Sequence, residues 1–139
     1  MSADTRGLIL HVDDHRAVRD GLALLLRTDD YAVHSAAGTR QALELINTGL
    51  NPDVLIVDFH LEEQMNGAQL AEQICGILHY APPIIVLSGY GADPPRTTDA
   101  PVWMTRKPLD PLRLLAALPG LIHLSRAARR KDTFSGLLA

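Results

Sequence analysis

Five short apolar runs alternate along the chain with longer segments in which apolar residues recur every three or four positions. The first pattern is typical of buried β-strands and the second of amphipathic helices. Strands separated by such helices form βα units, whose parallel sheet is covered by helices on both faces. The sequence therefore predicts an α/β fold with a doubly wound (βα)5 five-stranded parallel sheet. The predicted strands cover residues 8–12, 31–36, 54–57, 84–87 and 102–105.

Local signals mark the starts of the predicted helices. Thr39 is a candidate cap, Asn66 and Gln69 have the spacing of a capping box, and Asp110 precedes Pro111, which suits a first helical position. The predicted inward faces are Val18, Leu22, Leu25 and Leu26 for the first helix, then Ala42, Leu43 and Ile46, then Leu70, Ile74 and Leu78, and finally Leu112, Leu115 and Ala116.

Polar residues stand where four of the predicted strands end. Asp13 and Asp14 follow the first strand, Asp58 the third, Ser88 the fourth and Lys107 the fifth. Each of them alone is better explained as a helix cap, a turn residue or a surface charge. In doubly wound sheets, however, ligands bind beyond the carboxyl ends of the strands, and these five residues all belong to that edge. Their joint placement therefore predicts a functional site.

The residue types at this edge indicate phosphoryl transfer. Three neighbouring carboxylates repel one another, so such a site either raises a pKa or binds a cation. Oxygen ligands without a histidine and cysteine cluster favour a hard cation, and Mg²⁺ suits a site that also receives phosphate. An aspartate can itself be the nucleophile and form an aspartyl phosphate, with a hydroxyl and a lysine binding the phosphoryl oxygens.

Four stretches of the chain resemble the receiver domains of two-component response regulators. They read LILHVDDHRAVRDGLALLL, VLIVDFHL, IIVLSGYG and RKPLDP, and the resemblance covers about residues 7–119. It implies a CheY-like, flavodoxin-like sheet with strand order 2-1-3-4-5. The stretch SGYGADPP also resembles the single-domain receivers known as the FAT GUY type.

The resemblance assigns the metal ligands and the partners. By match to the family, Asp13, Asp14, Asp58 and the backbone carbonyl of His60 hold Mg²⁺. The phosphoryl group comes from a histidine kinase or a histidine phosphotransfer protein, and a downstream protein partner receives the signal.

The same match assigns the reacting groups. Asp58 is the phospho-acceptor, Ser88 is the switch hydroxyl, and Lys107 contacts the phosphoryl group. The family's cis lysine–proline bond corresponds here to Lys107 and Pro108.

Two departures from the family pattern concern the output of the signal. The usual aromatic switch position, three residues before the lysine, is Met104, and the adjacent Trp103 points to the other face of the strand. Only eighteen residues separate Ser88 from Lys107, which predicts a shortened or disordered fourth helix. We expect the signal to leave through the 88–107 face.

Composition limits the cellular setting and the ligands. A single cysteine suits a reducing cytoplasm, and no apolar run approaches the roughly 20 residues of a membrane span. We therefore expect a cytoplasmic protein without a membrane partner. Residues 1–125 are acidic overall, which argues against nucleic acid as a partner. We expect a receiver domain over residues 7–119 and a basic helical extension or tail over 120–139.

Three functions fit these observations. The first is a phosphorylation-controlled switch of a phosphorelay, which is no enzyme beyond Mg²⁺-assisted self-phosphorylation and autodephosphorylation. The second is a Mg²⁺-dependent phosphohydrolase with an aspartyl nucleophile. The third is a receiver excised from a hybrid histidine kinase. The first is favoured because few residues follow the last predicted helix.

Overall fold

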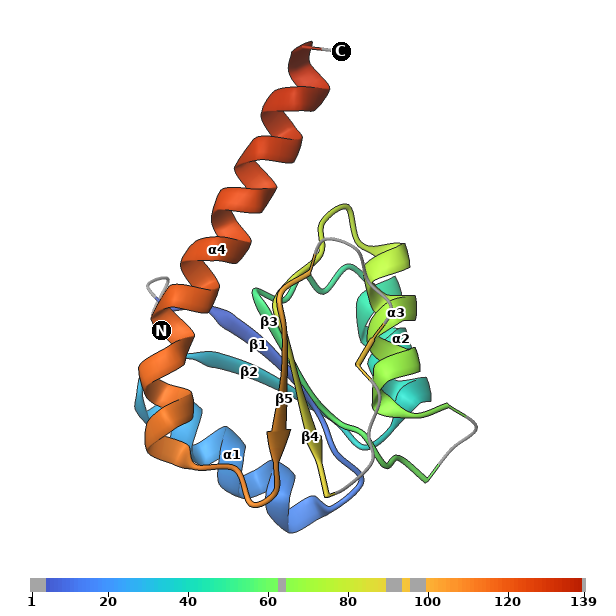
Figure 1. Ribbon diagram of the computed structural model, residues 1–139, viewed down its shortest axis with the longest axis vertical. Helices are drawn as coiled ribbons and strands as arrows, with labels where there is room; N and C mark the ends of the chain where they lie inside the picture. Colours follow the sequence, from blue (N-terminus) through green and yellow to red (C-terminus); the bar gives the residue numbers. More distant parts are fainter. Residues whose placement is uncertain (1–4, 63–64, 90–93, 96–99, 139) are drawn as a thin grey trace.

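The computed structural model describes residues 5–62, 65–89, 94–95 and 100–138, with side chains up to residue 130. Its strands are β1 (Leu8–Val12), β2 (Ala32–Ala36), β3 (Val54–Asp58), β4 (Ile84–Ser88) and β5 (Val102–Arg106). Its helices are α1 (Arg16–Thr28), α2 (Thr39–Asn47), α3 (Gly67–Ile77) and α4 (Pro111–Leu138) (Figure 1).

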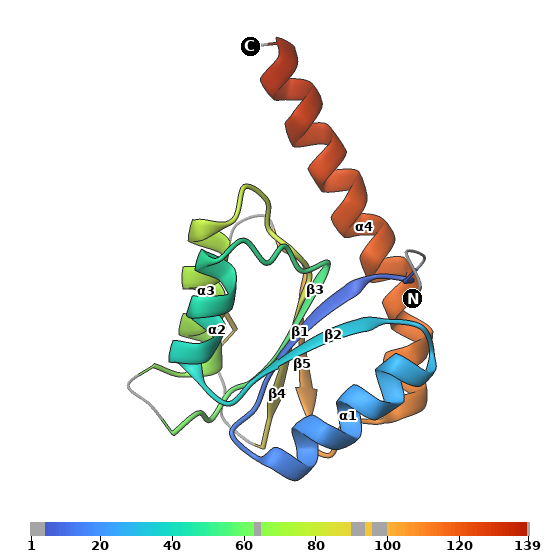
Figure 2. The ribbon, with the colours of Figure 1, turned by 180° about the vertical axis from the view of Figure 1, so that it is seen from behind.

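All neighbouring strands are parallel, in the order β2-β1-β3-β4-β5. Helices α1 and α4 cover one face of the sheet, and α2 and α3 cover the other (Figures 1 and 2). The predicted fold class and strand order are therefore confirmed. Every residue of β3 and β4 is buried, which explains why these strands are continuous apolar runs in the sequence.

The buried faces of two helices differ from the prediction. Val18 of α1 is 46% exposed, and the helix buries Leu22, Ala23 and Leu26. In α4 the predicted Leu112 is 78% exposed. Apart from Arg113, residues 112–118 are all apolar, so helical periodicity could not select the inward face. The residues of α4 that are buried against the sheet are Leu114, Leu118, Leu121 and Ile122.

Two of the three predicted helix caps are confirmed. The Asn66 side chain accepts a hydrogen bond from the Gln69 backbone, and Gln69 returns one to the Asn66 backbone. Asp110 Oδ1 accepts the Leu112 N–H at 3.0 Å. The predicted Thr39 cap is wrong, because Thr39 is the first residue of α2. The N-cap is Gly38, which has no side chain to accept a capping hydrogen bond.

The predicted fourth helix falls mainly on residues 90–93 and 96–99, which lie outside the described residues. The five described residues between β4 and β5 carry no helix. Beyond β5, α4 is continuous through Pro119 and continues past the sheet (Figure 1). None of the helices that the structure describes is long and apolar enough to cross a membrane.

The extension of α4 is attached to the body at the amino-terminal end of β3. Arg129 Nη2 donates to the backbone carbonyls of Asn51 and Pro52, both at 2.9 Å, and to the Tyr80 hydroxyl. Its guanidinium also stacks over the Tyr80 ring at 4.0 Å. Asp53 pairs with Arg129 at 3.3 Å. The helix therefore has a polar attachment as well as its apolar face.

Candidate functional site

The carboxyl ends of β1 and β3 bring three aspartates together. Carboxylate oxygens of Asp13, Asp14 and Asp58 and a ring nitrogen of His15 lie within 4.8 Å of one another. Asp13 and Asp58 are fully buried. The predicted acidic cluster is therefore formed, and it has a histidine at its rim.

Backbone donors orient two of these carboxylates. The His15 N–H donates to Asp13 Oδ1 at 2.8 Å, and the His60 N–H donates to Asp58 Oδ1 at 3.2 Å. Arg19 Nη1 of α1 donates to the Asp13 carbonyl at 2.8 Å, which fixes the turn between β1 and α1.

Lys107, directly after the end of β5, completes the site. Its Nζ lies 2.9 Å from Asp58 Oδ2, and its backbone N–H donates to the Ser88 carbonyl at 3.0 Å. The second contact joins the ends of β4 and β5, so the buried Ser88 lies at the same edge. The Lys107–Pro108 peptide bond is cis, as the resemblance implied. All five residues expected at this edge are therefore present there.

The acidic cluster fits a hard cation. Asp13 Oδ2 is buried and accepts no hydrogen bond from any described residue, so a bound cation would satisfy an oxygen that the protein leaves unpaired. The ligand set is dominated by carboxylate oxygens, which Mg²⁺ prefers.

Sequence reasoning missed His15. Its Nδ1 lies 2.9 Å from Asp14 Oδ1 and 3.2 Å from Asp13 Oδ1, and the side chain is two-thirds exposed. Its position directly after the aspartate pair was the available signal. The ring therefore bridges two of the carboxylates that are expected to bind the metal.

Gly67 was also missed, although it sets the distance between α3 and the end of β3. A Cβ at this position would lie 2.1 Å from the Asp58 carbonyl oxygen, closer than any side chain tolerates. The Gly67 N–H instead donates to the Phe59 carbonyl at 2.8 Å. The start of α3 therefore packs directly against the backbone of Asp58.

The family model of the response regulator receiver domain matches residues 9–118. The chain belongs to the response regulator receiver family. Receiver domains of this family are the signalling switches of two-component systems, and they bind Mg²⁺ in an acidic pocket.

Two curated relatives of this receiver come from Bacillus subtilis (strain 168). The transcriptional regulatory protein YdfI is 35% identical over 86 residues, which cover 61% of this chain and 39% of YdfI. The transcriptional regulatory protein LiaR is 36% identical over 88 residues, covering 59% of this chain and 38% of LiaR. The chain thus spans about two fifths of the length of these relatives.

Solved structures also resemble this receiver. The receiver domain of the hybrid histidine kinase CckA is 30% identical, with a TM-score of 0.71 over 84% of this chain and 99% of that one. A response regulator receiver protein from Sinorhizobium medicae WSM419 has a TM-score of 0.74 over 89% of this chain and 99% of that one. At 21% identity, the second likeness shows the fold alone.

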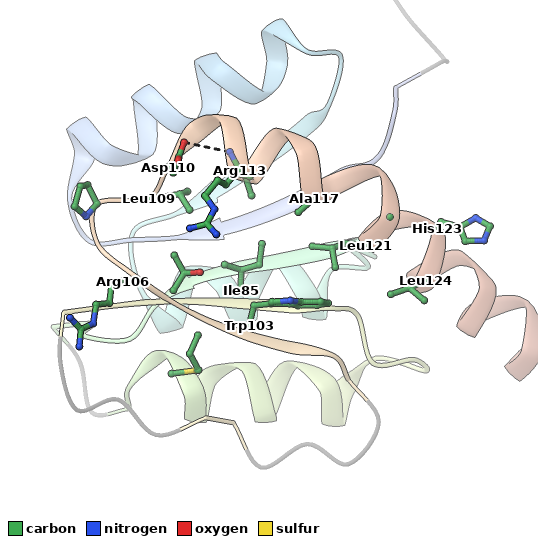
Figure 3. A pocket seen from close by; sticks show the side chains of 15 residues that line it. Ile85, Trp103, Arg106, Leu109, Asp110, Arg113, Ala117, Leu121, His123 and Leu124 are labelled. Atoms are coloured by element: carbon green, nitrogen blue, oxygen red, sulfur yellow. Dashed lines mark hydrogen bonds between the residues drawn. The ribbon is translucent and has the colours of Figure 1, made fainter.

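The strand β5 exposes two large apolar side chains on opposite faces of this receiver. Trp103 is paired with Ile85 and lines a groove between β5 and α4 together with Leu121 and Leu124 (Figure 3). Met104, at the position where the family has its aromatic switch, is 40% exposed. The two residues alternate across the strand, so Trp103 does not take the place of an aromatic at position 104.

His11, in the middle of β1, is buried beneath the acidic site. Neither ring nitrogen has a hydrogen-bond partner among the described residues. Burial lowers the pKa of His11 to about 4, and the positive charges of Arg19 and Lys107 act in the same direction against Asp13. The folded receiver therefore holds this imidazole neutral.

We expect His11 to make the receiver less stable in weak acid. The unfolded chain takes up a proton near pH 6.5 that the folded chain takes up only near pH 4. The stability that depends on neutral His11 is therefore fully present above pH 6.5 and is lost as the pH falls toward 4. Between pH 7.5 and pH 5, wild type should lose about 2 kcal/mol more unfolding free energy than His11→Val.

Urea unfolding in EDTA at the two pH values measures this difference. His34→Val removes a histidine from an exposed position of β2 and is the matched control, because it leaves His11 in place. If wild type and His11→Val lost the same unfolding free energy between pH 7.5 and pH 5, His11 would have no part in the effect.

Proposed function

We propose that this receiver is a phosphorylation-controlled switch that takes a phosphoryl group onto Asp58 from a phosphohistidine. The observation that carries the proposal is the setting of the Asp58 carboxylate. It is buried, Lys107 Nζ lies 2.9 Å from it, and the Asp13 and Asp14 carboxylates lie within 4.8 Å. A carboxylate that lies beside a lysine and beside an acidic cluster suited to Mg²⁺ can become an aspartyl phosphate.

The proposed transfer forms one bond and breaks one. An Asp58 carboxylate oxygen attacks phosphorus, the bond from phosphorus to the histidine nitrogen breaks, and the imidazole keeps the electron pair. Lys107 Nζ then binds a phosphoryl oxygen, and the Ser88 hydroxyl donates to another. Such transfer depends mainly on positioning and charge neutralisation, which these groups supply.

Asp13, Asp14, Asp58 and the His60 carbonyl are the proposed ligands of Mg²⁺. When bound, the ion supplies positive charge for the phosphoryl oxygens. The buried, unpaired Asp13 Oδ2 supports this assignment.

The proposed output is the 88–107 face. Ser88 at the end of β4 is paired with Arg106 of β5, so movement of the switch hydroxyl is coupled to the strand that exposes Trp103 and Met104. We also propose that residues 7–119 act as the receiver and residues 120–139 as a basic helical extension. The donor is a histidine kinase or a phosphotransfer protein, and the family relationship to the receiver of a hybrid kinase supports this class of partner.

Incubation with acetyl phosphate and Mg²⁺ tests the proposal. We expect the intact mass of the protein to rise by one phosphoryl group, and we expect EDTA to prevent the rise. Sustained turnover of p-nitrophenyl phosphate would instead indicate a phosphohydrolase. A chain that stays unmodified under saturating donor and Mg²⁺ would contradict the switch.

A further inference from the structure

A second pocket lies at the opposite end of the sheet from the phosphorylation site. It has a volume of about 420 Å³ and is formed by the segment before β1, the residue before β2, and α4. Arg6 and Tyr31 line it from the body, and His123, Arg126 and Arg130 line it from the helix. The start of β1 lies beside α4 in both views of the ribbon (Figures 1 and 2).

Most of the polar side chains that line the pocket are basic. His123, Arg126 and Arg130 are three and four residues apart, so they share one face of α4. Arg6 lies 2.8 Å from Asp29, and Arg126 lies 3.5 Å from Asp53, but no described residue forms a hydrogen bond or ion pair with the side chains of Arg130 or His123. Basic groups therefore outnumber the carboxylates that neutralise them.

Tyr31 contributes a buried side chain to the wall of the pocket. The residue is only 2% exposed, and its hydroxyl has no hydrogen-bond partner among the described residues. The Arg6 guanidinium lies over its ring, 4.9 Å from the centroid. An unpaired buried hydroxyl costs free energy unless a ligand or water completes it.

We infer that this pocket binds a small soluble anion carrying a phosphate or diphosphate group. Guanidinium groups bind phosphate oxygens through pairs of parallel hydrogen bonds, and Arg6 retains donors besides the one that Asp29 accepts. The Tyr31 ring forms part of the pocket wall, beneath the Arg6 guanidinium. The site is independent of Asp58 and needs no metal.

The charge distribution favours a small anion over a nucleic acid. Residues 126–139 hold four basic side chains and one acidic one, whereas residues 1–125 hold nine basic and fifteen acidic ones. A polyanion that crossed the rest of the surface would meet this excess of carboxylates, because its binding requires an extended basic face. A compact anion contacts the pocket alone.

Titration calorimetry with inorganic pyrophosphate in EDTA tests the inference on the full chain. We expect saturable binding of one pyrophosphate per chain, weakened about tenfold or more in Arg130→Gln, because a charge-assisted contact to phosphate is lost. His123→Asn should also weaken binding. The matched control is Arg40→Gln on α2, which removes an exposed arginine paired with Glu44 and should leave the affinity unchanged.

Three results would overturn the inference. One is no saturable binding of pyrophosphate to wild type. Another is equal affinity in wild type, Arg130→Gln and His123→Asn. The third is displacement of pyrophosphate by a short DNA duplex that binds more tightly, which would assign the basic face to nucleic acid. Because EDTA removes divalent ions, binding at the Asp58 site does not contribute to the heat.

Discussion

Asp58→Asn should take up no phosphoryl group under conditions in which wild type is fully modified. The amide has nearly the shape of the carboxylate and keeps an oxygen for the His60 N–H, so the fold should survive. It has no anionic oxygen to attack phosphorus, and the charge that pairs with Lys107 is lost. Intact mass after incubation with acetyl phosphate and Mg²⁺ measures the uptake.

Asp20→Asn is the control for this experiment. Asp20 lies on the exposed side of α1, 3.6 Å from Arg16, and its replacement should leave uptake at the wild-type level. Full modification of the Asp58→Asn chain would place the phospho-acceptor elsewhere.

Replacing both Asp13 and Asp14 with asparagine should nearly abolish Mg²⁺-dependent phosphorylation without unfolding the protein. Charge-assisted contacts contribute about 1.5–3 kcal/mol each, so loss of two charged ligands should lower the rate at a fixed Mg²⁺ concentration by about a hundredfold or more. The initial rate of modification, measured over a series of Mg²⁺ concentrations, gives the effect.

The stability of the same double variant should hold or rise in EDTA. The Asp13 side chain is fully buried with one oxygen unpaired, and its neighbours Asp14 and Asp58 are also acidic. Neutral amides relieve that repulsion, while an asparagine oxygen still accepts the His15 N–H. Urea unfolding measures this outcome. A double variant that is phosphorylated as wild type is would refute the assigned metal site.

The sheet and its reactive edge could be predicted because their signals are local. Each strand is a short apolar run, and each reactive residue lies at or just after the end of a strand. Parallel strands bring such ends together whatever the helices do, so the sequence alone predicts that Asp13, Asp58 and Lys107 meet. The capping box at Asn66 is local in the same sense, since its two hydrogen bonds join residues three apart.

Features that depend on packing between distant segments were not predictable. Leu112 and Leu114 are alike in the sequence, and only the docking of α4 makes one exposed and the other buried. Gly67 is required because α3 begins against the Asp58 carbonyl, a contact that the sequence does not show. The basic pocket joins Arg6 to Arg130, which are far apart along the chain.

The position of Trp103 makes the groove between β5 and α4 observable by fluorescence. It is the single tryptophan of the chain and is 43% exposed. Its indole emission therefore originates from one place, and its wavelength responds to how much water contacts the ring. A soluble collisional quencher reaches the ring through the open side of the groove. Intrinsic emission thus provides an optical record of this face without an added label.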